Sequence, residues 1–228
     1  MAGISLRDYQ TDAVERMKNG CILCGGVGSG KSRTALAYYY KQNGGKLGTK
    51  NYIRMPGTPK DLYIITTARK RDTLEWEGEL SPFLLSVHAE VNTYKNKVVV
   101  DSWNNIGKYA TVTDAFFIFD EQRVVGSGAW VKAFLKIAKF NEWILLSATP
   151  GDTWEDYIPV FVANGFYKNR TAFKEEHMVM TWVNGKYPKV DRYLGVGRLI
   201  RLRNRILVDM DFKRETCSHH EDVYVSYD

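Results

Sequence analysis

Residues 25–32 have the spacing G-x-x-x-x-G-K-S, which is typical of a loop that holds the phosphates of a nucleotide. The glycines let the backbone curl so that successive N–H groups point at a di- or triphosphate. The ammonium of Lys31 would reach the β- and γ-phosphates, and the hydroxyl of Ser32 would bind Mg²⁺. The residues predicted to hold the phosphates and the metal ion are Gly26, Gly28, Ser29, Gly30, Lys31 and Ser32.

Two adjacent carboxylates, Asp120 and Glu121, follow residues 115–119, the most hydrophobic run of the chain. A buried strand ending at this point would bring both carboxylates to one edge of a sheet. Asp120 would then hold Mg²⁺ directly or through water, and Glu121 would orient and deprotonate the attacking water. An Asp-Glu pair is common in proteins, but after a buried strand about 90 residues beyond a phosphate loop it specifically indicates nucleotide hydrolysis.

Two further polar groups complete the predicted site. Ser147 and Thr149 follow the apolar run at residues 143–146, and their hydroxyls could sense whether a γ-phosphate is present. Gln10 lies on a predicted amphipathic helix at residues 6–17, for which Ser5 is a suitable N-cap. A carboxamide can pair with the N6/N7 edge of adenine.

Alternating strands and helices must position these groups. The pattern predicts an α/β fold with a mostly parallel central sheet, whose ligand site lies at the carboxyl ends of the strands. A basic helix at residues 199–207 could contact phosphates or could be a solvated face. Strands are predicted at residues 21–24, 62–66, 97–100, 115–119 and 143–146, with a final strand at 222–228. Helices are predicted at 34–40, 70–80, 130–140, 153–162 and 171–177, and a hairpin with an Asn184-Gly185 turn at 179–190. Helical spacing assigns Trp76 and Leu80 to the core and turns Trp130, Phe134 and Ile137 inward.

Composition sets broad limits on the class of protein. The chain has 228 residues, of which 44% are hydrophobic, so it can bury a substantial core. A net charge of +6 suits a polyanionic partner but is weak support by itself. No run approaches the length of a membrane span, so no membrane partner is expected. Three cysteines in a chain of this size favour a reducing cytosol, and therefore a cytoplasmic location.

The combined motifs resemble, in order and spacing, the Q motif and motifs I, II and III of superfamily 2 helicases and translocases. They lie at residues 6–10, 25–32, 120–123 and 147–149, and the spacing is most similar to the Swi/Snf branch. Residues 103–122, 147–154 and 164–167 together resemble the short helicases of phages and prophages of Gram-positive bacteria.

This resemblance implies a RecA-like P-loop NTPase fold that binds ATP and Mg²⁺ and couples hydrolysis to movement on DNA, double-stranded or forked. It implies that Gln10 reads adenine and that Ser147 and Thr149 couple the site to DNA. It also implies a DNA-facing edge at Thr67, Arg69, Ser102 and Trp103.

Two departures from this family affect the interpretation. Motif II reads Asp-Glu-Gln-Arg instead of the commoner Asp-Glu-Ala-His or Asp-Glu-Ala-Asp, so Arg123 is unusual. The family has two RecA-like domains, and its arginine finger comes from the second. Here we expect one such domain at residues 1–207, with an insertion near 43–61 and an extension near 165–195, followed by a tail or linker at 208–228. A second RecA-like domain, in cis or in trans, is therefore an expected partner.

Three functions fit these observations. The leading one is a motor domain of an ATP-dependent DNA helicase or translocase, active only weakly by itself. A DNA-packaging ATPase of a phage would also carry a phosphate loop and an Asp-Glu pair. A non-catalytic ATP-binding clamp that needs a partner chain would fit the lack of an arginine finger.

Overall fold

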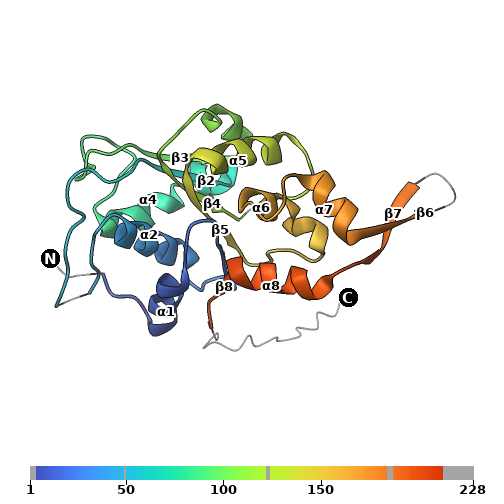
Figure 1. Ribbon diagram of the computed structural model, residues 1–228. Helices are drawn as coiled ribbons and strands as arrows, with labels where there is room; N and C mark the ends of the chain where they lie inside the picture. The colour runs from blue at the N-terminus through green and yellow to red at the C-terminus, as the bar shows by residue number, and fades with distance from the viewer. Residues whose placement is uncertain (1–3, 49, 122–123, 184–186, 213–228) are drawn as a thin grey trace, which may run out of the picture.

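A six-stranded sheet forms the centre of the computed structural model, which describes residues 4–48, 50–121, 124–183 and 187–212 (Figure 1). All its strand pairs are parallel, in the order β3-β2-β4-β5-β1-β8. The predicted α/β fold with a parallel central sheet is therefore confirmed. The strands are β1 (Ile22–Cys24), β2 (Leu62–Thr66), β3 (Val98–Ser102), β4 (Phe116–Asp120), β5 (Glu142–Ser147) and β8 (Leu207–Asp209).

Helices cover both faces of the sheet, because its strands carry apolar side chains on both faces. In β4, Phe116 and Ile118 join one buried cluster, and Phe117 and Phe119 join the other. The first cluster contains the apolar faces of α1 (Asp8–Arg16), α2 (Lys31–Gln42) and α4 (Glu75–Leu80). The second contains those of α5 (Ala129–Phe140), α6 (Ile158–Ala163), α7 (Arg170–His177) and α8 (Val196–Ile206). A sheet buried on both faces needs continuous apolar strands, and β4 is one.

The helix predicted at residues 70–80 is broken into two helices. Its first part is α3 (Ala68–Asp72), and the chain then passes through Leu74, whose φ of 58° is left-handed, before α4 begins. Thr73 favours the break, because its hydroxyl donates to Arg69 O and also contacts the side chain of Glu75. The break turns two short helices toward the same end of β4.

Two other details differ from the sequence-based expectation. Helix α1 begins after Arg7 and not after Ser5, because the backbone N–H of Arg7 donates to the side chain of Gln10 at 3.0 Å. Trp130, predicted to face inward, is 39% exposed and packs its ring on Trp103, with centroids 6.1 Å apart. The remaining short elements are the 3₁₀ helices η1 (Ser81–Phe83), η2 (Trp103–Tyr109) and η3 (Trp154–Tyr157).

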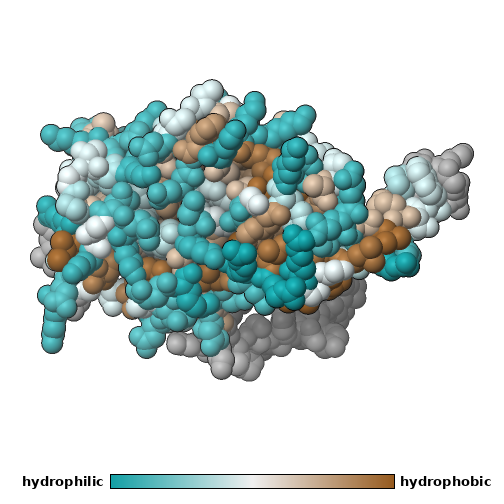
Figure 2. All heavy atoms as spheres, viewed as in Figure 1, coloured by the Kyte–Doolittle hydropathy of each residue, from teal (hydrophilic) through white to brown (hydrophobic). Residues whose placement is uncertain are grey.

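An antiparallel hairpin of β6 (Met178–Val183) and β7 (Tyr187–Tyr193) projects from the body beside α7 (Figure 1). Figure 2 shows the same projection in space-filling form, on a face that is otherwise mostly hydrophilic. The predicted hairpin is confirmed, whereas its Asn184-Gly185 turn and the strand predicted at 222–228 lie outside the described residues. Among the described residues, no helix is long and apolar enough to cross a bilayer.

Strand β8 closes the sheet beyond β1. It begins at Leu207, the residue at which the sequence placed the end of the ATPase domain, and its three residues pair with Ile22–Cys24. Met210 continues the contact, because its N–H donates to Cys24 O at 2.8 Å. The sheet therefore includes residues just beyond 207.

Candidate functional site

The phosphate loop lies between the end of β1 and the start of α2. Gly28 and Gly30 have φ values of 82° and 78°, in the left-handed region that glycine adopts at little cost. Gly30 directly precedes Lys31, the first residue of α2. The loop therefore leads into a helix N-terminus of the kind that binds anions.

Helix α1 supports this loop from behind. The hydroxyl of Tyr9 donates to Ser29 O at 3.2 Å, and the amide of Gln10 donates to Gly30 O at 3.4 Å. Gln10 is 6% exposed, and its side-chain oxygen accepts from Arg7 N. In this arrangement the amide nitrogen of Gln10 braces the loop while its oxygen caps α1, and its reading of adenine stays a prediction.

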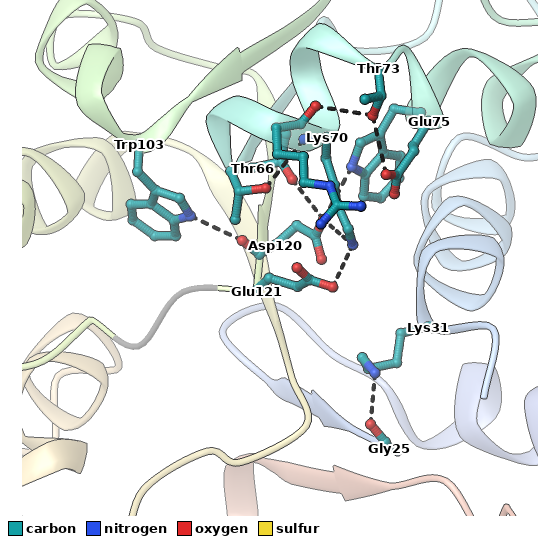
Figure 3. A network of polar contacts seen from close by, with 12 residues as sticks. Gly25, Lys31, Thr66, Lys70, Thr73, Glu75, Trp103, Asp120 and Glu121 are labelled. Carbon is teal, nitrogen blue, oxygen red and sulfur yellow. Dashed lines mark hydrogen bonds and ion pairs between the residues drawn. The ribbon is translucent and has the colours of Figure 1, made fainter. Parts of the chain in front are cut away.

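Lys31 points back over its own loop. Its ammonium donates to Gly25 O at 2.7 Å (Figure 3). It also donates to Gly26 O at 3.0 Å. Burial lowers the pKa of Lys31 below its usual value, and the negative charges of Asp120 and Glu121 offset part of that shift. The ammonium is therefore held at the mouth of the loop by two weak neutral acceptors, which phosphate oxygens could replace.

Asp120 is the last residue of β4 and is 1% exposed. Three donors converge on its Oδ2 (Figure 3): Thr66 Oγ1 at 2.8 Å, Trp76 Nε1 at 3.1 Å and Lys70 Nζ at 3.1 Å. Burial raises the pKa of Asp120 above its usual value, against the opposing effects of Lys70 and Thr66. The carboxylate is thus oriented by neighbours from β2, α3 and α4.

Glu121 turns into the site because its backbone is left-handed, with φ 57°. Its Oε1 lies 2.6 Å from Lys70 Nζ, so one ammonium bridges both carboxylates (Figure 3). Burial acts to lower the pKa of Lys70, but hydrogen bonds and charge from Glu121 and Asp120 outweigh it and raise that pKa. Glu121 is the more exposed carboxylate, with 45% of its side chain accessible compared with 2% for Asp120.

One cavity of about 970 Å³ joins these groups at the carboxyl edge of the sheet. The loop contributes Lys31 and Ser32, and β5 contributes Ser147 at its end. Ser147 Oγ accepts from the N–H of Thr149 at 3.1 Å, which holds the turn that follows β5. The predicted residues that line the cavity are Gly28, Gly30, Lys31, Ser32, Asp120, Glu121, Ser147 and Thr149.

The donor set fits Mg²⁺. The hydroxyl of Ser32 and the carboxylates of Asp120 and Glu121 line one cavity, and hard oxygen ligands of this kind are those that Mg²⁺ prefers. A cation already lies between the two carboxylates, namely the ammonium of Lys70. The position therefore favours positive charge.

The four residues predicted for the DNA-facing edge lie in different environments. Thr67 caps α3 by accepting from Lys70 N at 3.3 Å, and Arg69 is exposed. Ser102 and Trp103 are buried, at 2% and 3% exposure, so both belong to the protein interior next to this edge. DNA contact by any of the four stays a prediction.

Trp103 holds the end of β4, because its indole N–H donates to Asp120 O at 2.9 Å. We expect Trp103→Phe to lower the free energy of unfolding by about 1–3 kcal/mol, since this buried carbonyl loses its donor. Chemical denaturation measures the loss. Trp130→Phe is the matched control, because Trp130 belongs to the same ring contact but is 39% exposed. Equal losses in the two variants would contradict the role given to the hydrogen bond.

Sequence reasoning missed Lys70 and assigned Trp76 only to the core. Trp76 is indeed buried, but its indole N–H also needs an acceptor, and Asp120 provides it. Lys70 follows the N-cap Thr67 by three residues. A lysine in the first turn of a helix after a parallel strand lies at the ligand edge of the sheet, and this position was the signal available in the sequence.

Comparison of the sequence with protein-family models and with curated proteins found no match. Comparison of the fold found the Sulfolobus solfataricus SWI2/SNF2 ATPase core in complex with dsDNA, with a TM-score of 0.65 and 16% identity. The match covers 90% of this chain and 44% of that one. The Pyrococcus furiosus Hef helicase domain matches with a TM-score of 0.47 and 17% identity, over 78% of this chain and 41% of that one. The chain spans less than half the length of both. It shares the RecA-like α/β fold, with its parallel central sheet, of the Sulfolobus solfataricus ATPase core.

Proposed function

We propose that this chain is an ATP-hydrolysing motor domain of the helicase or translocase type, which couples hydrolysis to DNA binding or movement. One observation carries the proposal: a single cavity combines the ammonium of Lys31, the carboxylates of Asp120 and Glu121 and the hydroxyls of Ser147 and Thr149. Phosphate binding, metal binding and water activation are the three tasks of nucleotide hydrolysis, and this set of side chains suits each of them.

The phosphates of ATP would bind against the loop and the N-terminus of α2. Lys31 would exchange the carbonyls of Gly25 and Gly26 for phosphate oxygens, which form stronger, charge-assisted hydrogen bonds. Ser32 and Asp120 would hold Mg²⁺, which when bound neutralises charge on the phosphates. The proposed pocket is open enough for a triphosphate, since its volume is about 970 Å³.

Glu121 would accept the proton of the attacking water. Its exposed carboxylate suits this role better than that of Asp120, which is buried under three donors. Lys70 would hold the carboxylate of Glu121 in position, because its ammonium lies 2.6 Å from that carboxylate.

The described lining of the cavity includes no arginine, and Arg123 lies outside the described residues. In phosphoryl transfer an arginine stabilises the charge that develops in the transition state. We therefore propose that a second RecA-like domain, in cis or in trans, supplies it. The same observation favours the second candidate, an ATP-dependent clamp that binds nucleotide without turnover.

DNA is the proposed polymer, double-stranded or forked. The fold neighbour from Sulfolobus solfataricus was solved in complex with dsDNA, and the present chain carries a net charge of +6. Arg69 and Thr67 at the exposed start of α3 are the proposed backbone contacts.

The testing experiment measures binding of a fluorescent ATP analogue, and then single-turnover hydrolysis with and without single- and double-stranded DNA. We expect Mg²⁺-dependent binding, slow turnover that DNA accelerates, and loss of binding in Lys31→Ala. Binding without turnover under every condition would favour the clamp. A chain that binds no nucleotide would refute both functions.

A further inference from the structure

A second cavity, of about 360 Å³, lies beside the nucleotide site and has no role in the function proposed above. Its walls come from four segments: residues 151–154 after β5, Tyr157 in η3, Tyr193 at the end of β7 and Arg203 in α8. Three of the lining residues are aromatic and one is a guanidinium. Segments that are far apart in the sequence thus meet to present rings and a positive charge.

Arg203 is the main polar group of this cavity. Its guanidinium lies over the ring of Trp154, 5.5 Å from the ring centroid. Its Nε is buried and has no hydrogen-bond acceptor in the part of the chain that the structure describes. A buried donor without an acceptor is rare and costly in a folded protein, so the described residues leave the hydrogen-bonding capacity of this guanidinium partly unused. Asp152, which also lines the cavity, has a partner of its own.

The cavity lies near the edge of the sheet that carries the nucleotide site. Burial raises the pKa of Tyr157, Arg203 opposes that rise, and Cys24 and Asp209 are close enough to add to it. Cys24 and Asp209 end β1 and β8, so Tyr157 lies near the carboxyl ends of these strands. One short segment connects the two sites, because residues 147–149 line the first cavity and residues 151–154 line the second.

Aromatic rings together with a guanidinium match the chemistry of a nucleotide. Bases stack on aromatic side chains whatever their sequence, and a guanidinium binds phosphate oxygens through charge-assisted hydrogen bonds. The volume is near the lower end of the range of about 300–1,000 Å³ for small-molecule sites, as one nucleotide requires.

We infer that this cavity binds one unpaired nucleotide of a DNA strand, with its base against the aromatic wall and an acceptor oxygen on Arg203. The inference rests on the proposed DNA partner, and it adds a base-binding contact beside the hydroxyls that would sense the γ-phosphate. A strand held there would be attached to the segment of residues 147–154, which also borders the nucleotide.

Arg203→Met and Arg205→Met provide a matched pair for the test. Both arginines lie in α8, and each guanidinium lies over a ring, since Arg205 is 5.1 Å from the centroid of Phe166. Arg205 does not line the cavity. Both variants lose one positive charge, so any general electrostatic weakening is the same in each.

The measurement is the dissociation constant of an oligothymidylate and of an abasic oligonucleotide of the same length, by fluorescence anisotropy at one salt concentration. We expect Arg203→Met to weaken oligothymidylate binding about tenfold more than Arg205→Met does, which is near the lower end for loss of a hydrogen bond to a charged group. With the abasic strand we expect a smaller difference between the two variants, because the strand is no longer held by its base against the aromatic wall. Arg203→Lys, which keeps the charge, should fall between the wild type and Arg203→Met.

Three results would overturn the inference. One is equal weakening of oligothymidylate binding by the two matched variants. Another is a difference between the two variants that is as large on the abasic strand as on the oligothymidylate. The third is unchanged DNA binding together with weaker docking of a second motor domain, which would assign the cavity to a protein segment. Thermal melting confirms that each variant folds. Binding of the ATP analogue is scored separately, so failure of the nucleotide site is distinguishable from failure of this one.

Discussion

Replacing Glu121 by glutamine is expected to slow ATP hydrolysis by about 10²–10⁴-fold while leaving ATP binding almost unchanged. The amide has the shape of the carboxylate but cannot accept the proton of the attacking water. Binding persists because the phosphate loop and Lys31 are untouched, and Lys70 keeps its contact with Asp120. Single-turnover hydrolysis and equilibrium binding of the ATP analogue separate the two effects.

Glu79 supplies the matched control for this prediction. It lines the same cavity and is similarly exposed, at 36% of its side chain, and it pairs with Arg33 at 3.3 Å. Glu79→Gln removes the same charge, and because an exposed ion pair contributes only about 0.2–1 kcal/mol to stability, we expect hydrolysis to change little. If Glu79→Gln slowed hydrolysis as much as Glu121→Gln, the effect would be one of charge in the cavity and not of a catalytic base.

Replacing Lys70 by methionine is expected to lower the free energy of unfolding at neutral pH by about 3–5 kcal/mol, because Asp120 would lose its buried counter-ion. The same variant should bind Mn²⁺, as a substitute for Mg²⁺, more tightly in the absence of nucleotide. Lys70 lies 2.6 Å from Glu121 and 3.1 Å from Asp120, so its ammonium competes with a metal ion for both carboxylates. Chemical denaturation and Mn²⁺ titration measure the two effects.

The destabilisation caused by Lys70→Met should depend on pH. Burial already raises the pKa of Asp120, and loss of the ammonium removes a group that opposes this rise. Because the folded-state pKa is raised, protonation of Asp120 favours the folded state, and this contribution is lost as the pH rises through that pKa. The difference from wild type should therefore shrink as the pH falls toward the range in which Asp120 is protonated. Arg69→Met removes an exposed cation of the same helix and serves as the control; an equal and pH-independent loss there would contradict the prediction.

The sequence predicted the sheet and the main groups of the cavity well, for a physical reason. Residues 115–119 are apolar without interruption, which favours a strand buried on both faces, and polar residues after such a strand lie at the ligand edge. The glycine spacing likewise predicted the loop. These signals are local, so they can be read without knowing the tertiary structure.

What the sequence could not predict depends on contacts between distant segments. The hydrogen bond from Trp76 to Asp120 depends on the break at Leu74, after which α4 begins, and helical spacing alone did not predict that break. The aromatic cavity at Arg203 requires the hairpin, η3 and α8 to meet, and no periodicity reveals that. Trp130 was misplaced because helical spacing identifies an apolar face but not how far the neighbouring elements cover it.

Strand β8 also determines the order in which the sheet can form. Leu207 pairs with Ile22, about 185 positions away, and Arg16 of α1 donates to Asp209 O at 2.7 Å. During synthesis β1 is made early, and the backbone groups on the edge that pairs with β8 stay unpaired until residues 207–209 are made. Such an edge is where chains associate wrongly, and long-range pairing of this kind folds slowly. The strand that precedes the phosphate loop thus obtains its second neighbouring strand last. We therefore expect a chain that ends before residue 207 to aggregate.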